Sequence, residues 1–342
     1  MGDANGVMQI RKFLENAYLK PKPTVQIAIG RGFLLPLYKL RRLKIVFEGV
    51  ENIPSTPVIF AMNHTDRYNY WPFQFHLWTL GKQGRVRYPF TATWVKGKYY
   101  ENPWMARFMK WTGNIPVPSK GYLLAKDFTL LFGKSKPLAG EDFRLLKQYV
   151  DGEVDIEHLK DAKDPRVLEL ISTPHGDFNP KKHTYAEYIN ETFYELMKMV
   201  RDLNRDAVYN KKLNLIIFPE GTRSKRLIRG KPGIAQMAIA LKVPVVPVGC
   251  NGSDKVYTSD LPFIEKNGKI VYRLGKPIEL HKMEPFKIDE EFVPFTPQSE
   301  KLKKLFQQAT DLIMSIINNE LLDEEYRGDF THHDSTDIKS FI

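Results

Sequence analysis

Three short segments of this 342-residue chain carry residues that could act on a substrate. They are residues 63–69 (NHTDRYN), 218–224 (FPEGTRS) and 243–248 (VPVVPV). The first two follow apolar runs that read as strands, and a histidine at the carboxyl end of a strand stands where ligands usually bind in an α/β sheet. A Gly-Thr-Arg turn offers backbone donors, a hydroxyl and a guanidinium to a phosphate. These residue types therefore indicate a histidine in a ligand site and a turn that binds phosphate.

The elements that must position these residues follow from the hydrophobic pattern. Short β-rich runs predict strands at residues 44–49, 57–62, 88–93, 214–218, 244–249 and 269–274. Helical patterns predict helices at residues 184–204, 232–242 and 299–323. Strands interleaved with helices over this length predict an α/β fold with helices on both faces of the sheet.

The chain divides into three parts by pattern. Residues 1–43 are expected to form an amphipathic and basic helical segment, and residues 44–323 one domain with a helical insertion at about 133–205. Residues 324–342 are expected to form a polar, flexible tail. The insertion could be a lid, an acceptor-specificity element or a partner surface.

Positive charge is concentrated in the first third of the chain. Residues 1–126 hold 19 Lys and Arg against 6 Asp and Glu, whereas residues 127–342 hold 32 against 34. Such a segment points to a polyanion, which could be nucleic acid, an anionic membrane surface or a phosphorylated substrate. Aromatic and basic residues interleave in 94–111, a pattern that also suits single-stranded nucleic acid. Because no RNA-binding signature accompanies them, we expect lipid contact and no nucleic acid.

Counting tests for membrane insertion and metal binding. The longest stretch without a charge, residues 68–81, has 14 residues, short of the roughly 18–20 that span a bilayer. The N-terminus lacks the apolar core of a signal peptide. Residues 7–20 and the basic cluster at 39–44 could lie in a membrane interface or pack on the domain. A single cysteine, Cys250, excludes an intramolecular disulfide, and we expect no metal site.

Four motifs in order make the sequence similar to the glycerophospholipid acyltransferases, which include glycerol-3-phosphate and 1-acylglycerol-3-phosphate acyltransferases. That family's Asn-His-x4-Asp motif corresponds to Asn63 and His64, with Asn69 at the Asp position. Its second motif resembles residues 113–119 (GNIPVPS), its third matches 218–224 in full, and its fourth matches 243–248. The resemblance covers roughly 44–125 and 210–280. It implies a glycerol-3-phosphate acyltransferase-like fold, with a mixed, mostly parallel central sheet flanked by helices.

The resemblance also implies an activity. A fatty acyl group would move from acyl-CoA or acyl-carrier protein to a hydroxyl of a lysophospholipid or glycerol phosphate. The acyl thioester would be a co-substrate, and no cofactor is implied. The protein would lie on the cytoplasmic side of a membrane, peripheral or monotopic, against an anionic surface. His64 would be the general base, Arg223 with Gly221 and Thr222 would hold the acceptor's phosphate, and Glu220 would order their loop.

Two departures from the family pattern bear on this expectation. Asn69 replaces the carboxylate that orients the histidine, and its amide can accept from the ring but carries no charge to stabilise imidazolium. Ser119 stands where the family has a phosphate-binding Arg, so we expect Lys120 to take that part as a point charge. The alternative function is a catalytically impaired relative that binds acyl chains or phospholipid.

Residues 68–78 (YNYWPFQFHLW) contain six of the chain's aromatic side chains directly after the histidine. They could line an acyl channel, lie at the headgroup level of a bilayer, or pack in the core. The pattern leaves all three possibilities open.

Overall fold

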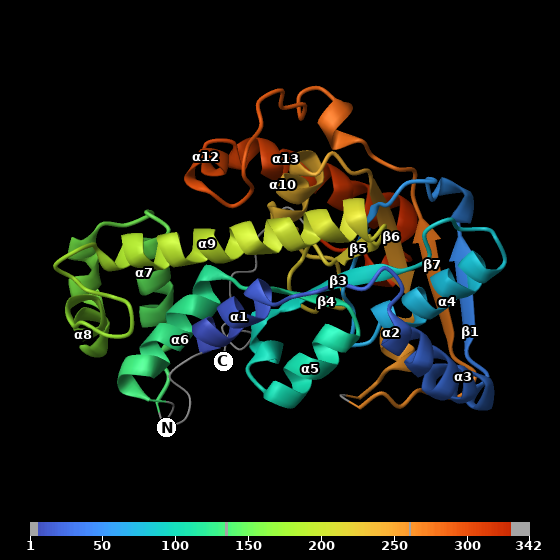
Figure 1. The fold of residues 1–342 in the computed structure, drawn as a ribbon, viewed down its shortest axis with the longest axis horizontal. Helices are drawn as coiled ribbons and strands as arrows, with labels where there is room; N and C mark the ends of the chain where they lie inside the picture. The colour runs from blue at the N-terminus through green and yellow to red at the C-terminus, as the bar shows by residue number, and fades with distance from the viewer. Residues whose placement is uncertain (1–5, 134–135, 260, 330–342) are drawn as a thin grey trace.

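One seven-stranded sheet organises the described residues of the computed structural model, 6–133, 136–259 and 261–329 (Figure 1). The strands are β1 (Lys44–Glu48), β2 (Ile59–Met62), β3 (Thr91–Lys96), β4 (Asn114–Val117), β5 (Asn214–Ile217), β6 (Val245–Asn251) and β7 (Lys269–Leu274). Their order is β1-β7-β6-β2-β5-β3-β4, and only the β6–β7 pair of this described sheet is antiparallel. The prediction of a mixed, mostly parallel α/β sheet is confirmed.

The pairing decides where the loops lie. Strands β2, β3, β4, β5 and β6 run parallel, so their carboxyl ends share one edge of the sheet, whereas β1 and β7 run the opposite way. The segments that follow β2 and β5 carry the predicted histidine and the predicted phosphate loop. Because β2 and β5 are neighbours, with Ala61 opposite Ile217, these two segments emerge side by side.

Both faces of the sheet are covered, so its central strands read as continuous apolar runs rather than alternating ones. In β2, Ile59 and Ala61 point into one hydrophobic core, and Phe60 and Met62 into the other. All four side chains are fully buried.

Helices from both ends of the chain cover the two faces. The core that holds Phe60 is completed by η1 (Gly30–Leu34), α3 (Leu35–Arg41), α4 (Tyr70–Lys82) and α11 (Ser253–Val256). The core that holds Ile59 is completed by α1 (Gly6–Glu15), α5 (Pro103–Trp111), α6 (Lys120–Phe132), α7 (Gly140–Val150), α8 (Arg166–Ser172), α9 (Tyr185–Arg205), α10 (Gly233–Ala240) and α13 (Lys303–Ile316). Helix α2 (Thr24–Ile29) leads into η1. The remaining short turns are η2 (Val50–Asn52), η3 (Gly97–Tyr100), η4 (Ile156–Asp161), η5 (Asp206–Asn210), η6 (Leu280–Lys282), α12 (Pro297–Glu300), η7 (Ile317–Leu321) and η8 (Glu324–Tyr326).

Strand β4 is absent from the predicted elements, because Asn-Ile-Pro-Val reads as a loop. Proline removes a backbone donor, so it is tolerated in a sheet mainly at an edge. Strand β4 is such an edge, paired with β3 alone in the described sheet. Most of residues 113–119, which resemble the family's second motif, therefore lie on a strand.

The insertion is more regular than its charged, Pro- and Gly-punctuated sequence indicates. Helix α7 buries Phe143, Leu146 and Tyr149 at helical spacing, and η4 and α8 follow it. Helix α9 begins with a capping box, in which the Thr184 hydroxyl accepts from the Glu187 N–H at 3.2 Å. It runs from the insertion back to the sheet (Figure 1).

The first residues of the predicted flexible tail are ordered against the domain, which corrects the prediction for them. Tyr326 is 1% exposed, its carbonyl accepts from the Leu227 N–H at 2.9 Å, and its hydroxyl donates to Asp254 at 2.7 Å. Residues 324–329 are therefore packed on the domain. The rest of the predicted tail, 330–342, lies outside the described residues, as do residues 1–5 of the N-terminal segment.

A buried ion pair joins the insertion to helix α6. His175 Nε2 lies 2.7 Å from Asp127 Oδ2, and His175 Nδ1 lies 2.6 Å from the Thr173 carbonyl oxygen. Since both partners are acceptors, both ring nitrogens must donate, which requires imidazolium. Tyr185 also donates to Asp127, at 2.8 Å. Burial lowers the pKa of His175, but Asp127 and the Thr173 carbonyl outweigh it, and the net pKa is raised.

We expect Asp127→Asn to lower the free energy of unfolding by about 3–5 kcal/mol, because the change leaves His175 buried and uncompensated. The stabilisation from a raised histidine pKa is fully present below the unfolded value of about 6.5 and is lost as pH rises through the folded value. Urea unfolding over this pH window measures both effects. The exposed Asp161→Asn variant is the control, and equal stabilities of the two variants would contradict the ion pair.

Candidate active site

The segment after β2 is clamped to the neighbouring strand β6. Asn63 Oδ1 accepts from the Cys250 N–H at 2.6 Å, and Asn63 Nδ2 donates to the Cys250 carbonyl oxygen at 3.0 Å. Asn63 is 2% exposed. These paired hydrogen bonds hold the backbone just before His64 to the centre of the sheet.

Glu220 joins the His64 segment to the loop after β5. Its Oε1 accepts from the His64 N–H at 2.7 Å, and its Oε2 accepts from the Ile228 N–H at 3.1 Å. The Ser224 N–H in turn donates to the His64 carbonyl oxygen at 2.9 Å. Burial raises the pKa of Glu220 to about 8, and its two backbone hydrogen bonds oppose the shift. Two segments about 156 residues apart in sequence thus form one unit.

The His64 ring lies on Phe218, with ring centroids 4.1 Å apart and an interplanar angle of 20°. The residue as a whole is half-buried, while its Nδ1 atom is fully buried. Burial, with the positive charges of Arg223 and Lys96, lowers the pKa of His64 to about 3, and the side chain of Asn69 opposes this. The imidazole is therefore neutral at physiological pH, as a proton acceptor must be.

Asn69 is fully buried at the start of α4. Its side-chain Nδ2 donates to the backbone carbonyl oxygen of Asn63 at 2.9 Å. Its backbone carbonyl oxygen accepts from the Tyr272 hydroxyl at 2.5 Å. Because the Asn63 oxygen can only accept, the amide must present its NH2 group there. Both Asn69 Oδ1 and His64 Nδ1 are buried without a hydrogen bond of good geometry, although Asn69 acts on the ring.

Asp66 does not substitute for the missing carboxylate. Its Oδ1 accepts from the Tyr68 N–H at 2.8 Å, and its Oδ2 accepts from the Thr65 hydroxyl at 3.0 Å. This is the geometry of an Asx turn. The carboxylate shapes the segment between His64 and α4.

The loop at 218–224 bends at Gly221, where φ is +68°. A Cβ at this position would lie 3.2 Å from Lys231 Nζ, so the lysine side chain crosses the glycine. Thr222 is half-buried and Arg223 is exposed. The loop therefore presents a hydroxyl and a guanidinium at the sheet edge beside His64.

The structure gives Ser119 and Lys120 other partners. Ser119 caps helix α6, its hydroxyl accepting from the Tyr122 N–H at 3.1 Å. Lys120 Nζ lies 3.2 Å from Asp151 and over the ring of Phe193. These contacts belong to the insertion, and the structure does not bring the two residues together with His64.

Lys96 is a cation near His64 that the sequence interpretation did not single out. It ends strand β3, which pairs with β5, and its charge reaches the His64 ring. The predicted strand ended at residue 93, whereas β3 continues to Lys96. The sequence therefore did not indicate that this lysine lies at the carboxyl end of a parallel strand. An accurate strand boundary would have pointed to it.

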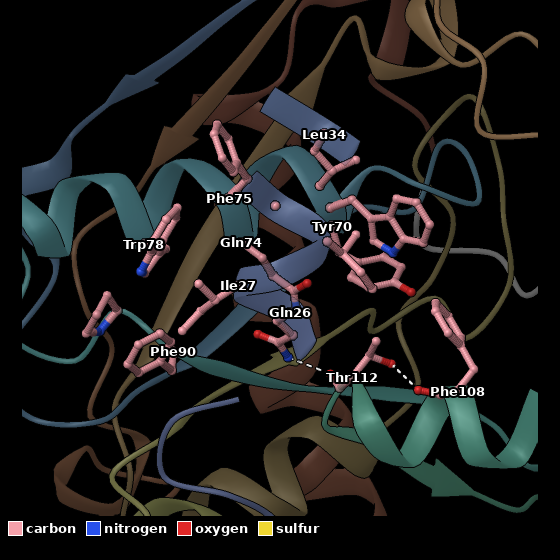
Figure 2. Close-up of a pocket in the computed structure, with 14 residues that line it drawn as sticks. Gln26, Ile27, Leu34, Tyr70, Gln74, Phe75, Trp78, Phe90, Phe108 and Thr112 are labelled. Atoms are coloured by element: carbon pink, nitrogen blue, oxygen red, sulfur yellow. Dashed lines mark hydrogen bonds between the residues drawn. The ribbon is translucent and has the colours of Figure 1, made fainter. Parts of the chain in front are cut away.

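An aromatic pocket lies beside this edge, between the N-terminal helices, α4 and α5 (Figure 2). The space enclosed by its walls, together with open solvent at its mouth, has a volume of about 550 Å³. The walls are Gln26, Ile27, Ile29, Gly30, Leu34, Tyr70, Trp71, Gln74, Phe75, Trp78, Pro89, Phe90, Phe108 and Thr112. Both amide side chains make hydrogen bonds, Gln26 to the Thr112 carbonyl and Gln74 to the Thr91 hydroxyl, which leaves a largely apolar interior.

One end of the pocket approaches His64. The Tyr70 ring lies edge-on to Phe218 at 6.3 Å, and Phe218 lies against His64. Helix α4 divides the aromatic run: Phe73 is fully buried in the core, whereas Tyr70 and Trp78 line the pocket (Figure 2). Some aromatic side chains of α4 therefore pack in the core and others line the pocket, on different faces of one helix.

Residues 189–251 match the model of the Acyltransferase family, a range that includes the loop at 218–224. A curated relative, the 1-acyl-sn-glycerol-3-phosphate acyltransferase of Cocos nucifera, is 33% identical over 104 residues, 28% of this chain. Over these segments the chain is similar to the glycerophospholipid acyltransferases. This similarity agrees with the resemblance seen in the four motifs.

The extent of these similarities differs. The match spans about a third (33%) of the length of the coconut acyltransferase. The crystal structure of the 1-acyl-sn-glycerophosphate (LPA) acyltransferase PlsC from Thermotoga maritima is similar with a TM-score of 0.38 and 15% identity, covering 86% of this chain and 81% of that one. Within this acyltransferase-like chain, the family match contains the phosphate-loop segment but not His64.

The described residues contain neither a membrane-spanning helix nor a cluster of metal ligands. Among residues 6–133, 136–259 and 261–329, no helix has the length and apolarity needed to cross a bilayer. The same residues contain no group of three His, Cys, Asp or Glu side chains placed to hold a metal ion.

Proposed function

We propose that this chain transfers a fatty acyl group from a thioester, acyl-CoA or acyl-carrier protein, to a hydroxyl of a lysophospholipid or glycerol phosphate at a membrane. The observation that carries the proposal is the unit formed by His64, Glu220 and the loop at 218–224, one aromatic ring from an apolar pocket. The name of the coconut relative favours a 1-acylglycerol 3-phosphate as acceptor.

His64 acts as the general base. With Nδ1 buried toward Asn69, the other ring nitrogen takes the proton of the acceptor hydroxyl. The resulting alkoxide attacks the thioester carbonyl carbon, a C–O bond forms, and the C–S bond then breaks. The leaving thiolate receives the proton from His64, which returns the imidazole to its neutral form.

Arg223 and Lys96 bind the acceptor's phosphate, with the turn at Gly221 and Thr222 supplying further donors. The same two cations lower the pKa of His64. A bound phosphate neutralises their field, so the base strengthens when the acceptor is present. Glu220 positions the two segments that carry these groups.

The aromatic pocket holds an acyl chain. Its lining is mostly apolar, as the binding of a hydrocarbon chain requires. Because Tyr70 connects it to Phe218 and His64, a chain lying in the pocket would end near the base.

The proposal is tested by incubating the full chain with labelled acyl-CoA or acyl-carrier protein and a panel of acceptors, and identifying products by lipid mass spectrometry. We expect a diacyl product from 1-acylglycerol 3-phosphate or a monoacyl product from glycerol 3-phosphate. Turnover of neither acceptor with either donor would contradict the proposed activity.

Lys96→Ala is expected to raise the KM for the acceptor about 10- to 100-fold, the cost of one charge-assisted hydrogen bond. The turnover number should change less, because Lys96 acts on the phosphate rather than on the reacting hydroxyl. The comparison is Lys120→Ala, which should leave KM unchanged and lower stability through loss of its Asp151 partner. If Lys120→Ala raised the KM more than Lys96→Ala, Lys120 rather than Lys96 would bind the phosphate.

A catalytically impaired lipid-binding protein is the second candidate function. The observation in its favour is the amide at position 69, since neither Asn69 Oδ1 nor His64 Nδ1 makes a well-formed hydrogen bond. It predicts that the chain binds acyl lipid in the pocket without consuming the thioester.

A further inference from the structure

Exposed apolar side chains cluster on three elements. Among the residues that the structure describes, twelve large apolar side chains are exposed, and seven of them lie on α5, on the segment from η1 to α3, and on the loop between α11 and β7. These seven are Phe33, Leu40, Trp104, Met105, Trp111, Leu261 and Phe263. An apolar concentration of this kind marks an interaction surface rather than scattered surface residues.

Hydrogen bonds connect the three elements. Gln26 of α2 donates to the carbonyl oxygen of Thr112, next to the end of α5, at 2.5 Å. At the other end of the segment, the Asn267 N–H donates to the Arg41 carbonyl oxygen at 2.7 Å. In Figure 1, α5, α3 and this loop follow the lower side of the molecule. We call the exposed parts of α5, of residues 24–44 and of the loop at 257–259 and 261–268 the apolar-basic surface.

Helix α5 carries the two most informative side chains of this surface. Met109 is buried and Phe108 lines the pocket, so these residues attach the helix to the protein. Trp104 and Trp111, seven residues apart and so on one helix face, are 76% and 56% exposed. Exposed tryptophan is costly in water and favourable at a membrane interface, where one part of the ring is apolar and the N–H stays wet.

The charge of the surface matches anionic lipid. Residues 24–44 contain five Lys and Arg and no acidic residue, and α5 contains Arg107 and Lys110 and no acidic residue. The loop at 257–268 contains one lysine and two acidic residues, so the three segments together keep a positive excess. The Arg107 guanidinium lies 5.3 Å from the centre of the Trp104 ring. Basic residues next to interfacial aromatic groups gain about 1 kcal/mol each near an anionic surface.

We propose that the apolar-basic surface docks on an anionic lipid bilayer, with Trp104 and Trp111 of α5 at the headgroup level. The aromatic pocket lies between two of its elements, α2 with η1 and α5, so docking places the pocket beside the lipid from which an acceptor comes. The proposal rests on the proposed function for the identity of that acceptor, but the docking itself is measured without catalysis.

The experiment is cosedimentation of the full chain with vesicles of phosphatidylcholine and phosphatidylglycerol. We expect Trp104→Ser/Trp111→Ser to bind at least about tenfold more weakly than the unmodified chain. Leu261→Ser/Phe263→Ser tests the loop independently. The matched control is Ile156→Ser/Leu168→Ser, which removes two exposed apolar side chains from the insertion and should bind normally.

Two further readouts separate docking from catalysis. Lipids brominated in the upper acyl chain should quench tryptophan fluorescence in the unmodified chain and much less in the Trp104→Ser/Trp111→Ser variant. Turnover of a water-soluble short-chain acceptor should be the same in both. Unchanged vesicle binding in the α5 and loop variants, or equal binding to vesicles of phosphatidylcholine alone, would overturn the docking surface. Absence of turnover with normal vesicle binding would instead count against the proposed function.

Discussion

Replacing His64 with alanine is expected to lower the turnover number for acyl transfer by about 10²–10⁴, the usual contribution of a positioned general base. No other histidine has its backbone bound by the phosphate loop in the part of the chain that the structure describes. The loss should appear in kcat and in kcat/KM together, because the proton transfer contributes only in the transition state. Continuous detection of the released thiol measures it.

The control for this variant is His158→Ala, which removes an exposed histidine from η4 and should leave turnover unchanged. Thermal unfolding of both variants separates lost chemistry from lost structure, since the His64 ring also packs on Phe218. Acyl transfer by a folded His64→Ala variant at the normal rate would remove His64 from the mechanism, and with it the role of the site as a base-catalysed acyltransferase.

Asn69→Asp is expected to have two opposite consequences. A carboxylate next to the ring favours imidazolium, so the pKa of His64 should rise and the acidic limb of the pH–rate profile should move to higher pH by about one unit or more. At the same time, an oxygen replaces the amide donor that faces the Asn63 carbonyl, which should lower the free energy of unfolding by about 1–3 kcal/mol. The pH–rate profile and urea unfolding measure the two effects separately.

Asn69→Leu completes the series, because leucine is similar in size and removes both the acceptor and the donor. It should lower kcat by about 10²-fold or more, through loss of ring orientation, and lower stability by leaving the Asn63 carbonyl unpaired. If Asn69→Leu retains full turnover while His64→Ala does not, the amide does not orient the base. An unchanged pH–rate profile in Asn69→Asp would give the same conclusion.

Most of the predicted strands and helices are present in the structure, because buried strands and long amphipathic helices have strong local patterns. Residues 214–218 and 184–204 predicted β5 and α9 almost to the residue. Strand β4 was missed because its proline obscures a pairing that exists only at the sheet edge. The predicted helical insertion did not give the bounds of α7 and α8, because much of this segment is charged and its apolar positions become a pattern only when α9 covers them.

The cation that lies near the base could not be chosen from the sequence. Lys120 was the nearest basic residue to the motif position held by Ser119, but helix α6 turns it toward Asp151. Lys96 reaches His64 because β3 and β5 are neighbours in the sheet. That neighbourhood is a property of strand order, and local sequence contains little information about strand order.

By itself the sequence determined the α/β class and the basic first third, and it predicted the histidine and the loop at 218–224 as site residues, because each is a matter of residue type and short spacing. Only the tertiary structure decided that Glu220 joins two distant segments, that Asn69 turns its amide toward Asn63, and that the aromatic run divides between core and pocket. It also brought the exposed tryptophans and the basic helices together. The physical reason is that each of these features depends on side chains from separate strands and helices. Packing and strand order decide which of these side chains come into contact, and the local sequence around each residue does not.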